Sequence, residues 1–476
     1  MENKAILDIF LNEQVVFLVD SRKVYEGDVR LDSTYFVNKS NDNINVEILK
    51  KPLIEFVQSI DEPKLFSRIY CDKKYGIPYI SSSEMSEIGP QINSRFISRT
   101  LTNNISQYII KRGQILVSAA GTVGTIVLAT QELDEVAGTS DILRINTNEK
   151  SYLGLIYTYL SSDFGANELT NIAYGAIIKR IRGFHLESLK IPIISSDINK
   201  ELNDLILKSL DCRDIANDLI KKARSLVLQY NNLPLLDDVE LETLDSEKET
   251  DIHLVSTNEF TEDYRLNAYF YNPMADLVVR NIKDYSADFQ RLEEVVNDII
   301  LGKRFKRNYV EVNHGTPFLS GKNIIQIRPD VKYLSNAEIG FMDELLIKKN
   351  WILITCSGTI GRTCFVYNNY EDYAASQHIL RVVPNEVAID SGYLYCFLST
   401  DYGYHQTLRY KYGAVIDEID DDNIANILIP ICSLERQKEI GDLVRQAYDL
   451  RAEAICLENE AQEILTKALT GRERVL

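Results

Sequence analysis

The chain has 476 residues, of which 45% are hydrophobic, and its formal net charge at pH 7 is −18. This length accommodates two or three hydrophobic cores, and no run approaches the about 18 apolar residues that a membrane helix needs. Residues 1–8 lack the layout of a signal peptide, so we expect a soluble protein of the cytoplasm that contacts no membrane. The seven cysteines form no CxxC pair, which argues against a disulfide framework or a zinc site.

In chain order, the sequence predicts an N-terminal extension, two domains that are each followed by a long helix, and a linker. The linker is predicted because residues 237–251 hold eight acids and one lysine, a composition typical of a solvated segment. The segments are the extension at 1–24, the first domain at 25–195, the first helix at 196–232, the acidic linker at 233–257, the second domain at 258–431 and the second helix at 432–471.

Each domain is predicted to be mixed α/β, or α+β. Short β-rich runs separated by Gly-Thr or acidic turns precede a helical stretch in both. The runs are 114–118, 125–128 and 142–145, with a helix at 153–160, in the first domain, and 351–355, 364–367 and 379–383, with a helix at 394–398, in the second.

The two domains are copies of one another. Residues 113–124 return as 350–361, and Asp141-Ile-Leu-Arg returns as His378-Ile-Leu-Arg, both at a spacing of 237. One residue is then inserted, and Tyr174-Gly-Ala matches Tyr412-Gly-Ala at a spacing of 238. The repeating unit is a whole domain with its helix, which excludes a solenoid of short repeats.

A heptad pattern runs along both long helices. Apolar or small residues recur in steps of three and four in the second helix, and a shift of 238 finds the same register in the first. Matched heptads predict an antiparallel coiled coil, with the domains at opposite ends of a rigid spacer and related by a pseudo-twofold axis. The alternative is that each helix covers its own domain. The predicted seam contains Leu202, Leu205, Ala216, Leu219, Leu226, Leu443, Ala447, Leu450, Ala454, Leu457 and Ile464.

Motifs typical of enzymes are missing from the sequence. There is no Gly-x-x-x-x-Gly-Lys-Ser/Thr loop, no His-Glu-x-x-His and no Gly-x-Ser-x-Gly. The five histidines neither cluster nor recur between the copies, although a duplicated enzyme is expected to duplicate its acid, base or nucleophile. The sequence favours a binding module with no catalytic residues and no metal of its own.

The duplicated Gly-Thr-x-Gly turn is the strongest short motif. Two glycines and a threonine hydroxyl after a buried strand let a protein backbone approach a phosphate. This makes Thr122, Thr125, Thr359 and Arg362 candidate DNA contacts. The alternative is a tight β-turn with nothing bound.

Basic residues supply further candidates. Residues 303–307 hold four cations and one aromatic ring, a composition suited to gripping a phosphate backbone, although charge runs are often only solvated surfaces. The four cations are Lys303, Arg304, Lys306 and Arg307. Weaker candidates of the same kind are Lys322, Asn323, Arg409, Lys411 and Tyr412.

The two copies differ in charge after the Tyr-Gly-Ala motif. Basic side chains read guanine and acidic ones accept from cytosine, so the difference fits two domains that present different recognition surfaces. For the acidic copy we favour the alternative, which is drift on an unused surface. The residues are Tyr174, Lys179, Arg180 and Arg182 in the first copy, against Tyr412, Asp417, Glu418 and Asp420 in the second.

Taken together, these features resemble the specificity subunit of type I restriction-modification systems over nearly the whole chain. The first copy keeps Pro192 but lacks the glutamine that stands at 437 in the second, and residues 1–24 and the acidic charge also depart from the family pattern. The resemblance rests on Ser-Gly-Thr-Ile-Gly at 357–361, Leu-Ser-Thr-Asp-Tyr at 398–402, Tyr412-Gly-Ala, and Ile429-Pro-Ile followed by a helix start at 435–440.

The resemblance implies a non-catalytic reader of double-stranded DNA with two target-recognition domains, each binding one half of a split target. It also implies that the helices dock two copies of an adenine methyltransferase subunit and that a restriction subunit joins through them. No cofactor is implied for this chain, because S-adenosylmethionine would belong to the methyltransferase. Helices of about 35 residues span about 50 Å, or about 15 base pairs, which suits a bipartite site.

The acidic charge also fits a second function. An interaction scaffold or inhibitor of the same fold would compete with DNA for a methyltransferase, and the acidic residues that follow Tyr412 motivate this alternative. An intrinsic nuclease or methyltransferase is disfavoured by the missing motifs.

Overall fold

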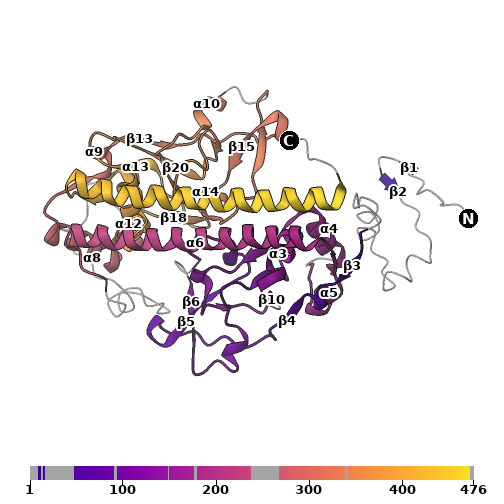
Figure 1. Cartoon of the computed structure of the whole chain (residues 1–476). Coiled ribbons are helices and arrows are strands. Elements are labelled where there is room, and N and C mark those ends of the chain that lie inside the picture. Colours follow the sequence, from indigo (N-terminus) through magenta and orange to yellow (C-terminus); the bar gives the residue numbers. More distant parts are fainter. Residues whose placement is uncertain are drawn as a thin grey trace, which may run out of the picture.

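The computed structural model describes residues 9–11, 14–16, 48–90, 94–147, 150–175, 179–236, 267–337 and 341–471. The predicted acidic linker from residue 237 onward and most of the predicted N-terminal extension lie outside these residues. Two sheet-containing domains lie on either side of two long helices that run side by side (Figure 1). Within the described ranges, no helix combines the length and apolar character that crossing a bilayer demands.

The first domain is built on a four-stranded antiparallel sheet in the order β4-β10-β7-β8. A three-stranded sheet, β6-β5-β9, and a two-stranded pair, β11-β3, complete it. Its strands are β3 (Lys50–Pro52), β4 (Val57–Asp61), β5 (Gly76–Ile80), β6 (Arg95–Ser98), β7 (Ile115–Ser118), β8 (Ile126–Leu128), β9 (Ala137–Gly138), β10 (Ile142–Thr147) and β11 (Lys190–Pro192). Its helices are α3 (Leu153–Ser161), α4 (Asp163–Ile172) and α5 (Gly183–Ser188), and a separate pair, β1 (Ile9–Leu11) and β2 (Gln14–Val16), precedes it in the chain.

The second domain repeats this order, which confirms the duplication. Its main sheet is β13-β20-β17-β18, its second sheet is β14-β16-β15-β19, and its closing pair is β12-β21. The strands are β12 (Phe289–Arg291), β13 (Val296–Leu301), β14 (Tyr309–Val310), β15 (Gly315–Leu319), β16 (Lys332–Ser335), β17 (Ile352–Ser357), β18 (Thr359–Phe365), β19 (Ala374–Ala375), β20 (Ile379–Pro384) and β21 (Leu428–Pro430). The helices are α8 (Pro273–Tyr285), α9 (Leu292–Val295), α10 (Met342–Leu345), α11 (Ser391–Leu398), α12 (Asp401–Arg409) and α13 (Asp421–Ala425).

The main sheet of the first domain is buried on both faces because its strands are apolar on both. Successive side chains of a strand point to opposite faces. Val117 and Leu143 pack on the side of α3, whereas Leu116 and Ile142 pack against Ile80 of the second sheet. The predicted β-rich runs are therefore continuous apolar segments rather than alternating ones.

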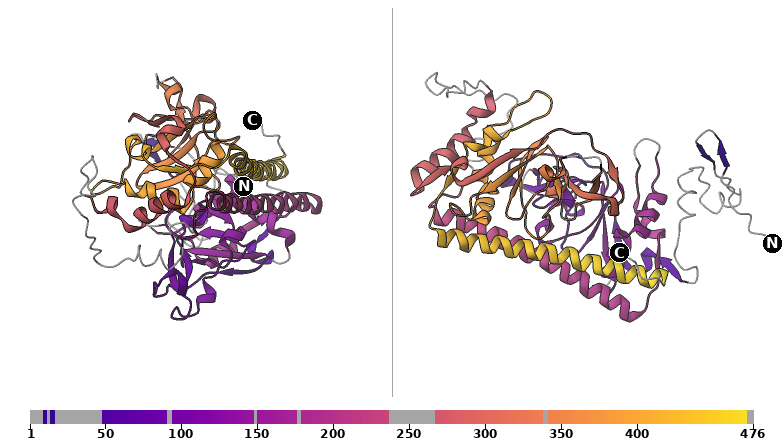
Figure 2. Two further views of the ribbon diagram at one scale, coloured as in Figure 1. Left: turned by 90° about the vertical axis from the view of Figure 1, so that its left-hand side faces the viewer. Right: turned by 90° about the horizontal axis from the view of Figure 1, so that it is seen from above.

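The two long helices are antiparallel neighbours. They are α6 (Ser196–Tyr230) and α14 (Leu434–Thr470). Tyr230 at the end of α6 donates to Glu439 near the start of α14 at 2.7 Å, whereas Leu202 near the start of α6 shares a buried cluster with Leu465 near the end of α14. Figure 2 shows the pair along one side of the molecule.

An amide side chain ties the start of each long helix to its domain. Gln437, which is 1% exposed, accepts a hydrogen bond from the backbone N–H of Asp390 at 3.1 Å. Asn199 stands at the equivalent position, at a spacing of 238, and donates to the carbonyl of Ser151 at 2.9 Å. The glutamine missing from the first copy is therefore replaced by a shorter amide that still binds the segment before the preceding helix.

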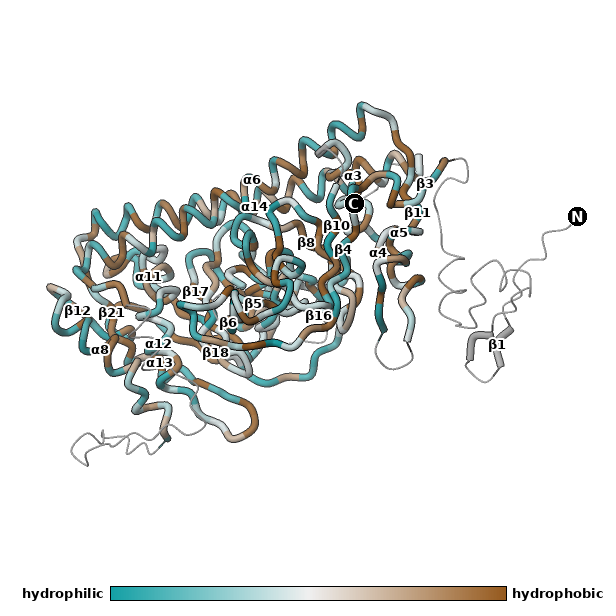
Figure 3. The backbone as a smooth tube through the Cα atoms, turned by 90° about the horizontal axis from the view of Figure 1, so that it is seen from below, coloured by the Kyte–Doolittle hydropathy of each residue, from teal (hydrophilic) through white to brown (hydrophobic). Residues whose placement is uncertain are grey.

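Each long helix buries two stripes rather than the single predicted seam. Along the seam, Cys212, Ala454 and Leu457 pack together with Leu205 and Leu450. The second stripe is offset by one position and covers the domains, so each helix packs on its partner and on the domains as well. Brown, hydrophobic segments accordingly recur along both helices in Figure 3. The second stripe includes Ile206, Leu210, Arg213, Ile220, Val227, Val444, Tyr448, Arg451, Glu458, Leu465 and Leu469.

The two domains pack on opposite ends of the helix pair, and they also contact one another directly. Residues 86–89 of the first domain and 325–328 of the second form a contact that we call the interdomain clasp. Ile88 N–H donates to the carbonyl of Ile325 at 2.6 Å, and Ile327 N–H donates to the carbonyl of Ser86 at 2.8 Å. Arg362 adds an ion pair of 3.0 Å across the contact. The sequence did not predict this contact, because heptads determine how helices pack and do not determine where loops of the domains meet.

Candidate nucleic-acid interface

Two loops meet at the edge of the main sheet in each domain. In the second domain, Tyr412 and Glu418 exchange backbone hydrogen bonds of 2.9 and 2.7 Å, and Glu418 also bridges to Ser357 beside the Gly-Thr turn. The Tyr-Gly-Ala loop and the Gly-Thr-x-Gly turn therefore lie side by side, although they are far apart in the sequence. The first domain repeats this arrangement with Tyr174, Arg180 and Ala120, while residues 176–178 of its loop lie outside the described residues.

Backbone conformation explains the glycines of the Gly-Thr-x-Gly turns. Their φ angles are 79° at Gly121, 83° at Gly124, 75° at Gly358 and 80° at Gly361, a region in which other residues are strained. No atom lies within 4 Å of a Cβ added at Gly121 or Gly358, so the conformation and not the available space requires glycine there. The neighbouring threonines, Thr122 and Thr359, are exposed at the tips, whereas Thr125 is half-buried and donates to the Thr122 carbonyl at 3.2 Å.

Each domain neutralises the charges of its own Tyr-Gly-Ala loop. The pairs are Arg180 with Asp141 (3.5 Å) and Arg182 with Glu62 in the first domain, and Lys411 with Asp417 (2.9 Å) and Arg304 with Glu418 (3.8 Å) in the second. The basic residues of the first loop thus pair with acidic side chains, and the acidic residues of the second loop pair with basic ones. Lys179 is exposed at the loop of the first domain.

Three of the predicted contacts are held inside the fold. Arg362 is 6% exposed and is part of the interdomain clasp. Arg409 pairs with Asp276 at 3.1 Å. Asn323 is buried and accepts from the backbone N–H and the hydroxyl of Ser320, at 2.9 and 2.6 Å. These side chains stabilise the observed arrangement, and a contact with DNA would first require them to leave it.

The basic run at 303–307 is only partly available. Lys303 pairs with Glu344 at 2.9 Å, and the ring of Phe305 packs into a small aromatic cluster. Lys306 is exposed, and Arg307 donates to Gln377 at 2.8 Å. The exposed Lys322 lies on a different loop.

A second duplicated feature was not predicted from the sequence, and we call it the cation–aromatic clusters. Cluster 1 contains Arg68, Tyr70, Tyr79 and Arg95, and cluster 2 contains the equivalent Arg307, Tyr309, Phe318 and Lys332. The cations lie over rings at 5.6 Å (Arg68 on Tyr79), 5.1 Å (Arg95 on Tyr70), 5.2 Å (Arg307 on Phe318) and 5.0 Å (Lys332 on Tyr309). The signal was present in the sequence at a spacing of 239, where Arg68-Ile-Tyr matches Arg307-Asn-Tyr and Gly76-Ile-Pro matches Gly315-Thr-Pro.

Comparison with known proteins identifies the family. A family model for the type I restriction modification DNA specificity domain matches residues 45–227 and 287–460, which is most of the chain and both copies. The chain belongs to the type I restriction-modification specificity family. Two solved structures are similar to it: the S subunit from M. genitalium, at 15% identity over 92% of this chain and 98% of that chain with a TM-score of 0.33, and the HsdS subunit from Thermoanaerobacter tengcongensis, at 14% identity over 90% and 98% with a TM-score of 0.28.

Membership confirms the predicted resemblance and implies that this chain recognises a DNA target. The family match ends its first part at residue 227 and its second at 460, so each specificity domain includes most of its long helix. In the structure, the second stripe of each long helix contributes to the cores of both domains.

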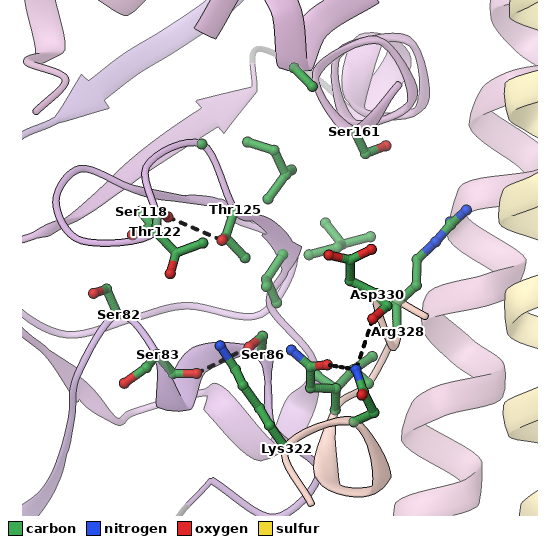
Figure 4. Close-up of a pocket in the computed structure, with 18 of the residues that line it drawn as sticks. Ser82, Ser83, Ser86, Ser118, Thr122, Thr125, Ser161, Lys322, Arg328 and Asp330 are labelled. Atoms are coloured by element: carbon green, nitrogen blue, oxygen red, sulfur yellow. Dashed lines mark hydrogen bonds between the residues drawn. The ribbon is translucent and has the colours of Figure 1, made fainter. Parts of the chain in front are cut away.

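A cavity of about 810 Å³ opens between the two specificity domains and the helices. In Figure 4, Lys322 of the second domain extends toward Ser83 and Ser86 of the first, and Thr122 and Thr125 line the opposite side. Four predicted contacts, Thr122, Thr125, Lys322 and Asn323, thus line one cavity, although they come from different domains.

Buried titratable groups of this specificity protein serve the fold. Burial raises the pKa of the thiols of Cys356, Cys364 and Cys396 to about 12, so these thiols stay protonated and unreactive at neutral pH. Among the described residues, no group of three or more His, Cys, Asp or Glu side chains is placed to hold a metal ion.

Proposed function

We propose that this chain is a non-catalytic reader of a bipartite DNA target, with one half of the target bound by each specificity domain. The observation that carries the proposal is that both domains present the same pair of adjacent loops with different side chains. Two half-sites of different sequence require a common scaffold with variable tips. The family match to each copy supports the assignment of one half-site to each domain.

The long helices are proposed to form an antiparallel coiled coil on a pseudo-twofold axis. The clasp supports this symmetry, because Ile88 and Ser86 are equivalent to Ile327 and Ile325 at a spacing of 239 and their two hydrogen bonds are reciprocal. We infer that this helix pair docks two methyltransferase subunits, which would carry S-adenosylmethionine, and that restriction subunits join the same complex in the cytoplasm. The methyltransferases would also supply much of the phosphate neutralisation that a chain of charge −18 lacks.

Methylation mapping tests the proposal. The chain is expressed with its methyltransferase in a host that lacks adenine methylation, and methylated adenines are located by single-molecule sequencing. We expect a split motif of two short specific halves around a fixed gap, which disappears when this chain is deleted. A continuous motif, or methylation that survives the deletion, would sink the proposal.

A single substitution tests whether each domain specifies one half of the motif. Lys179→Gln removes an exposed cation beside the loops of the first domain, so we expect it to change or relax one half of the motif by about 1–3 kcal/mol of discrimination while the gap and the other half stay the same. Lys190→Gln, an exposed change on β11, is the matched control and leaves both halves intact. A variant in which both halves change together would contradict one domain per half-site.

The inhibitor alternative has less support than the reader, because two of the acidic residues that motivated it are paired within their own domain. Lys411 pairs with Asp417, and Arg304 pairs with Glu418. An acidic mimic of DNA needs carboxylates that face outward without cationic partners.

A further inference from the structure

The basic residues of the loops and those of the cation–aromatic clusters are held in different ways. Most basic candidates in the loops are neutralised by a carboxylate, as Arg180 is by Asp141 and Arg304 is by Glu418. The cation–aromatic clusters behave differently. Among the described residues, no ion pair is formed by Arg68, Arg307 or Lys332, and an aromatic ring holds each of them in place.

A ring and a carboxylate have different consequences for a cation. A carboxylate removes the net charge, whereas a ring attracts the cation through its quadrupole and leaves the charge of +1 intact. A cation held over a ring also loses less side-chain entropy when it binds an anion, because it is already ordered. The clusters are therefore preorganised positive sites on a chain that is negative overall.

The clusters are also exposed on corresponding strands. Tyr70 and Tyr309 are each 45% exposed at the sheet edge, whereas Tyr79 and Phe318 form the buried floor beneath the arginines. Both domains keep this arrangement of cation and ring, although their Tyr-Gly-Ala loops have come to carry opposite charges. A role common to both half-sites, and independent of their sequence, fits this pattern.

Cluster 1 has a second property that points to a ligand. A cavity of about 410 Å³ is lined by its four residues, by Ser81, Ser82 and Thr139, and by the carboxylates of Glu84 and Asp141. Both carboxylates are engaged within the domain, since Asp141 pairs with Arg180 and Glu84 accepts from the hydroxyl of Ser81. The hydroxyl of Thr139 is buried there without a hydrogen-bond partner among the described residues. A buried hydroxyl without a partner is costly, and a bound oxyanion or its water would satisfy it.

We propose that the two cation–aromatic clusters are the phosphate-binding sites of the specificity domains, each gripping the DNA backbone beside one half-site. This inference rests on the proposed DNA-reading function and adds to it the residues that bind without regard to sequence. Direct phosphate contacts position a protein on the duplex, whereas base contacts carry the specificity. The clusters would set affinity and register, and the loop tips would select the target.

Salt dependence of DNA binding tests the inference. The full-length chain, in complex with the methyltransferase subunits that co-purify with it, is titrated against a labelled 40-base-pair duplex of random sequence at 50 and 200 mM salt. The variant Arg68→Gln/Arg307→Gln removes one cluster cation from each domain. Each lost phosphate contact lowers the slope of log affinity against log salt by about 0.9. We therefore expect the ratio of wild-type to variant affinity to fall about tenfold between the two salt concentrations.

The chain supplies a matched control at another duplicated position. Lys111 and Lys348 are equivalent at a spacing of 237, are exposed, and are neutralised by Glu135 and Asp372. Lys111→Gln/Lys348→Gln removes the same two charges, and we expect its affinity ratio to change less than twofold. The charge-conserving Arg68→Lys/Arg307→Lys keeps the wild-type salt slope if the sites bind phosphate as proposed.

The outcomes separate this inference from the proposed function. Equal salt slopes for the wild type and Arg68→Gln/Arg307→Gln, or equal losses in this variant and the lysine control, overturn the inference even when a split methylation motif is found. A reduced slope without any split motif supports phosphate binding and overturns bipartite reading. A wild-type complex that binds no DNA overturns both.

Discussion

Glu458 is the most consequential single residue of the helix pair. It is 3% exposed and accepts hydrogen bonds from Arg213 at 2.8 Å, Arg328 at 3.0 Å and Ser209 at 2.9 Å. Burial acts to raise the pKa of this carboxyl, but Arg213 and Arg328 outweigh burial and hold the pKa below its ordinary value of 4.5. One carboxylate thereby joins α14 to α6 and to the second domain.

Substitution of Glu458 is expected to be severe. Glu458→Gln leaves Arg213 buried without its counter-charge, and breaking a buried pair in this way costs about 3–5 kcal/mol. Thermal denaturation of the full chain is the measurement, and Glu453→Gln is the control because its pair with Lys208 is exposed. A loss no larger than that of the control would contradict the structural role of Glu458.

The same residue predicts a dependence of stability on pH. Because the pKa of Glu458 is lower in the folded chain than its ordinary value, its charge stabilises the fold above about pH 4.5, and this stabilisation disappears as the pH falls through the folded pKa. The wild type should therefore lose more stability below about pH 4.5 than Glu458→Gln, which has no carboxylate to protonate. Parallel losses in both proteins would show that other groups control acid unfolding.

At the scale of elements, the two long helices are crossed closely by one short helix from each domain. A Cβ added at Gly392 of α11 would lie 2.7 Å from the Cα of Gly441 in α14. At the equivalent Gly154 of α3 it would lie 2.4 Å from the Cα of Asn203 in α6. Glycine is thus required at both crossings by backbone contact, and this requirement was duplicated with the domain.

Alanine at Gly392, where α11 crosses α14, tests how tightly this crossing is packed. Alanine favours a helix over glycine by about 1 kcal/mol, but the clash is with backbone that cannot rotate away, and such overpacking costs about 1–3 kcal/mol. Gly392→Ala should therefore lower the melting temperature. Gly321→Ala is the control, because its nearest contact would be an ordinary 3.7 Å. An unchanged melting temperature for Gly392→Ala would show that the crossing is loose.

The sequence predicted these elements well but only one of the surfaces that join them. The long helices and most predicted strands lie close to their predicted ranges, because a heptad register and continuous apolar runs determine them. However, β18 begins five residues before the predicted run at 364–367, and β4 and β13 of the main sheets were not predicted. The second helix stripe was not predicted because Arg213, Arg451 and Glu458 interrupt its apolar residues. Apolar periodicity gives no sign of charged residues that are buried. The cation–aromatic clusters were missed because an insertion moved the register to 239.

At the scale of the whole molecule, the interdomain clasp fixes how the two specificity domains face one another. No local pattern predicts it, because it joins loops that are far apart in the chain. Arg362 bridges it by donating to Glu87 at 3.0 Å and to the carbonyl of Ile88 at 2.6 Å. If each domain binds one half-site as proposed, the spacing of the half-sites depends on this contact as well as on helix length.

Removal of Arg362 is expected to open the clasp. Hydrogen bonds to a charged group contribute about 1.5–3 kcal/mol, so Arg362→Met should speed amide hydrogen exchange at residues 86–89 and 325–328 by about tenfold or more. Exchange is read by mass spectrometry on peptides that cover the two segments. Arg291→Met, which breaks an exposed pair with Glu293, should leave both segments unchanged. Protection that is unchanged in Arg362→Met would mean that the backbone bonds alone hold the domains together.

The first domain can complete its core only late in translation, because residues of α14 form part of that core. Ala461, Leu465 and Leu469 belong to the buried cluster of that domain, together with Leu202 and Leu210. At about 5–20 residues per second, they emerge roughly 12–50 seconds after Leu210 does. The domain synthesised first is therefore the last to have its core closed. A nascent chain must keep that apolar surface from aggregating until its final helix is made, and a truncation near the C-terminus would damage the N-terminal reader first.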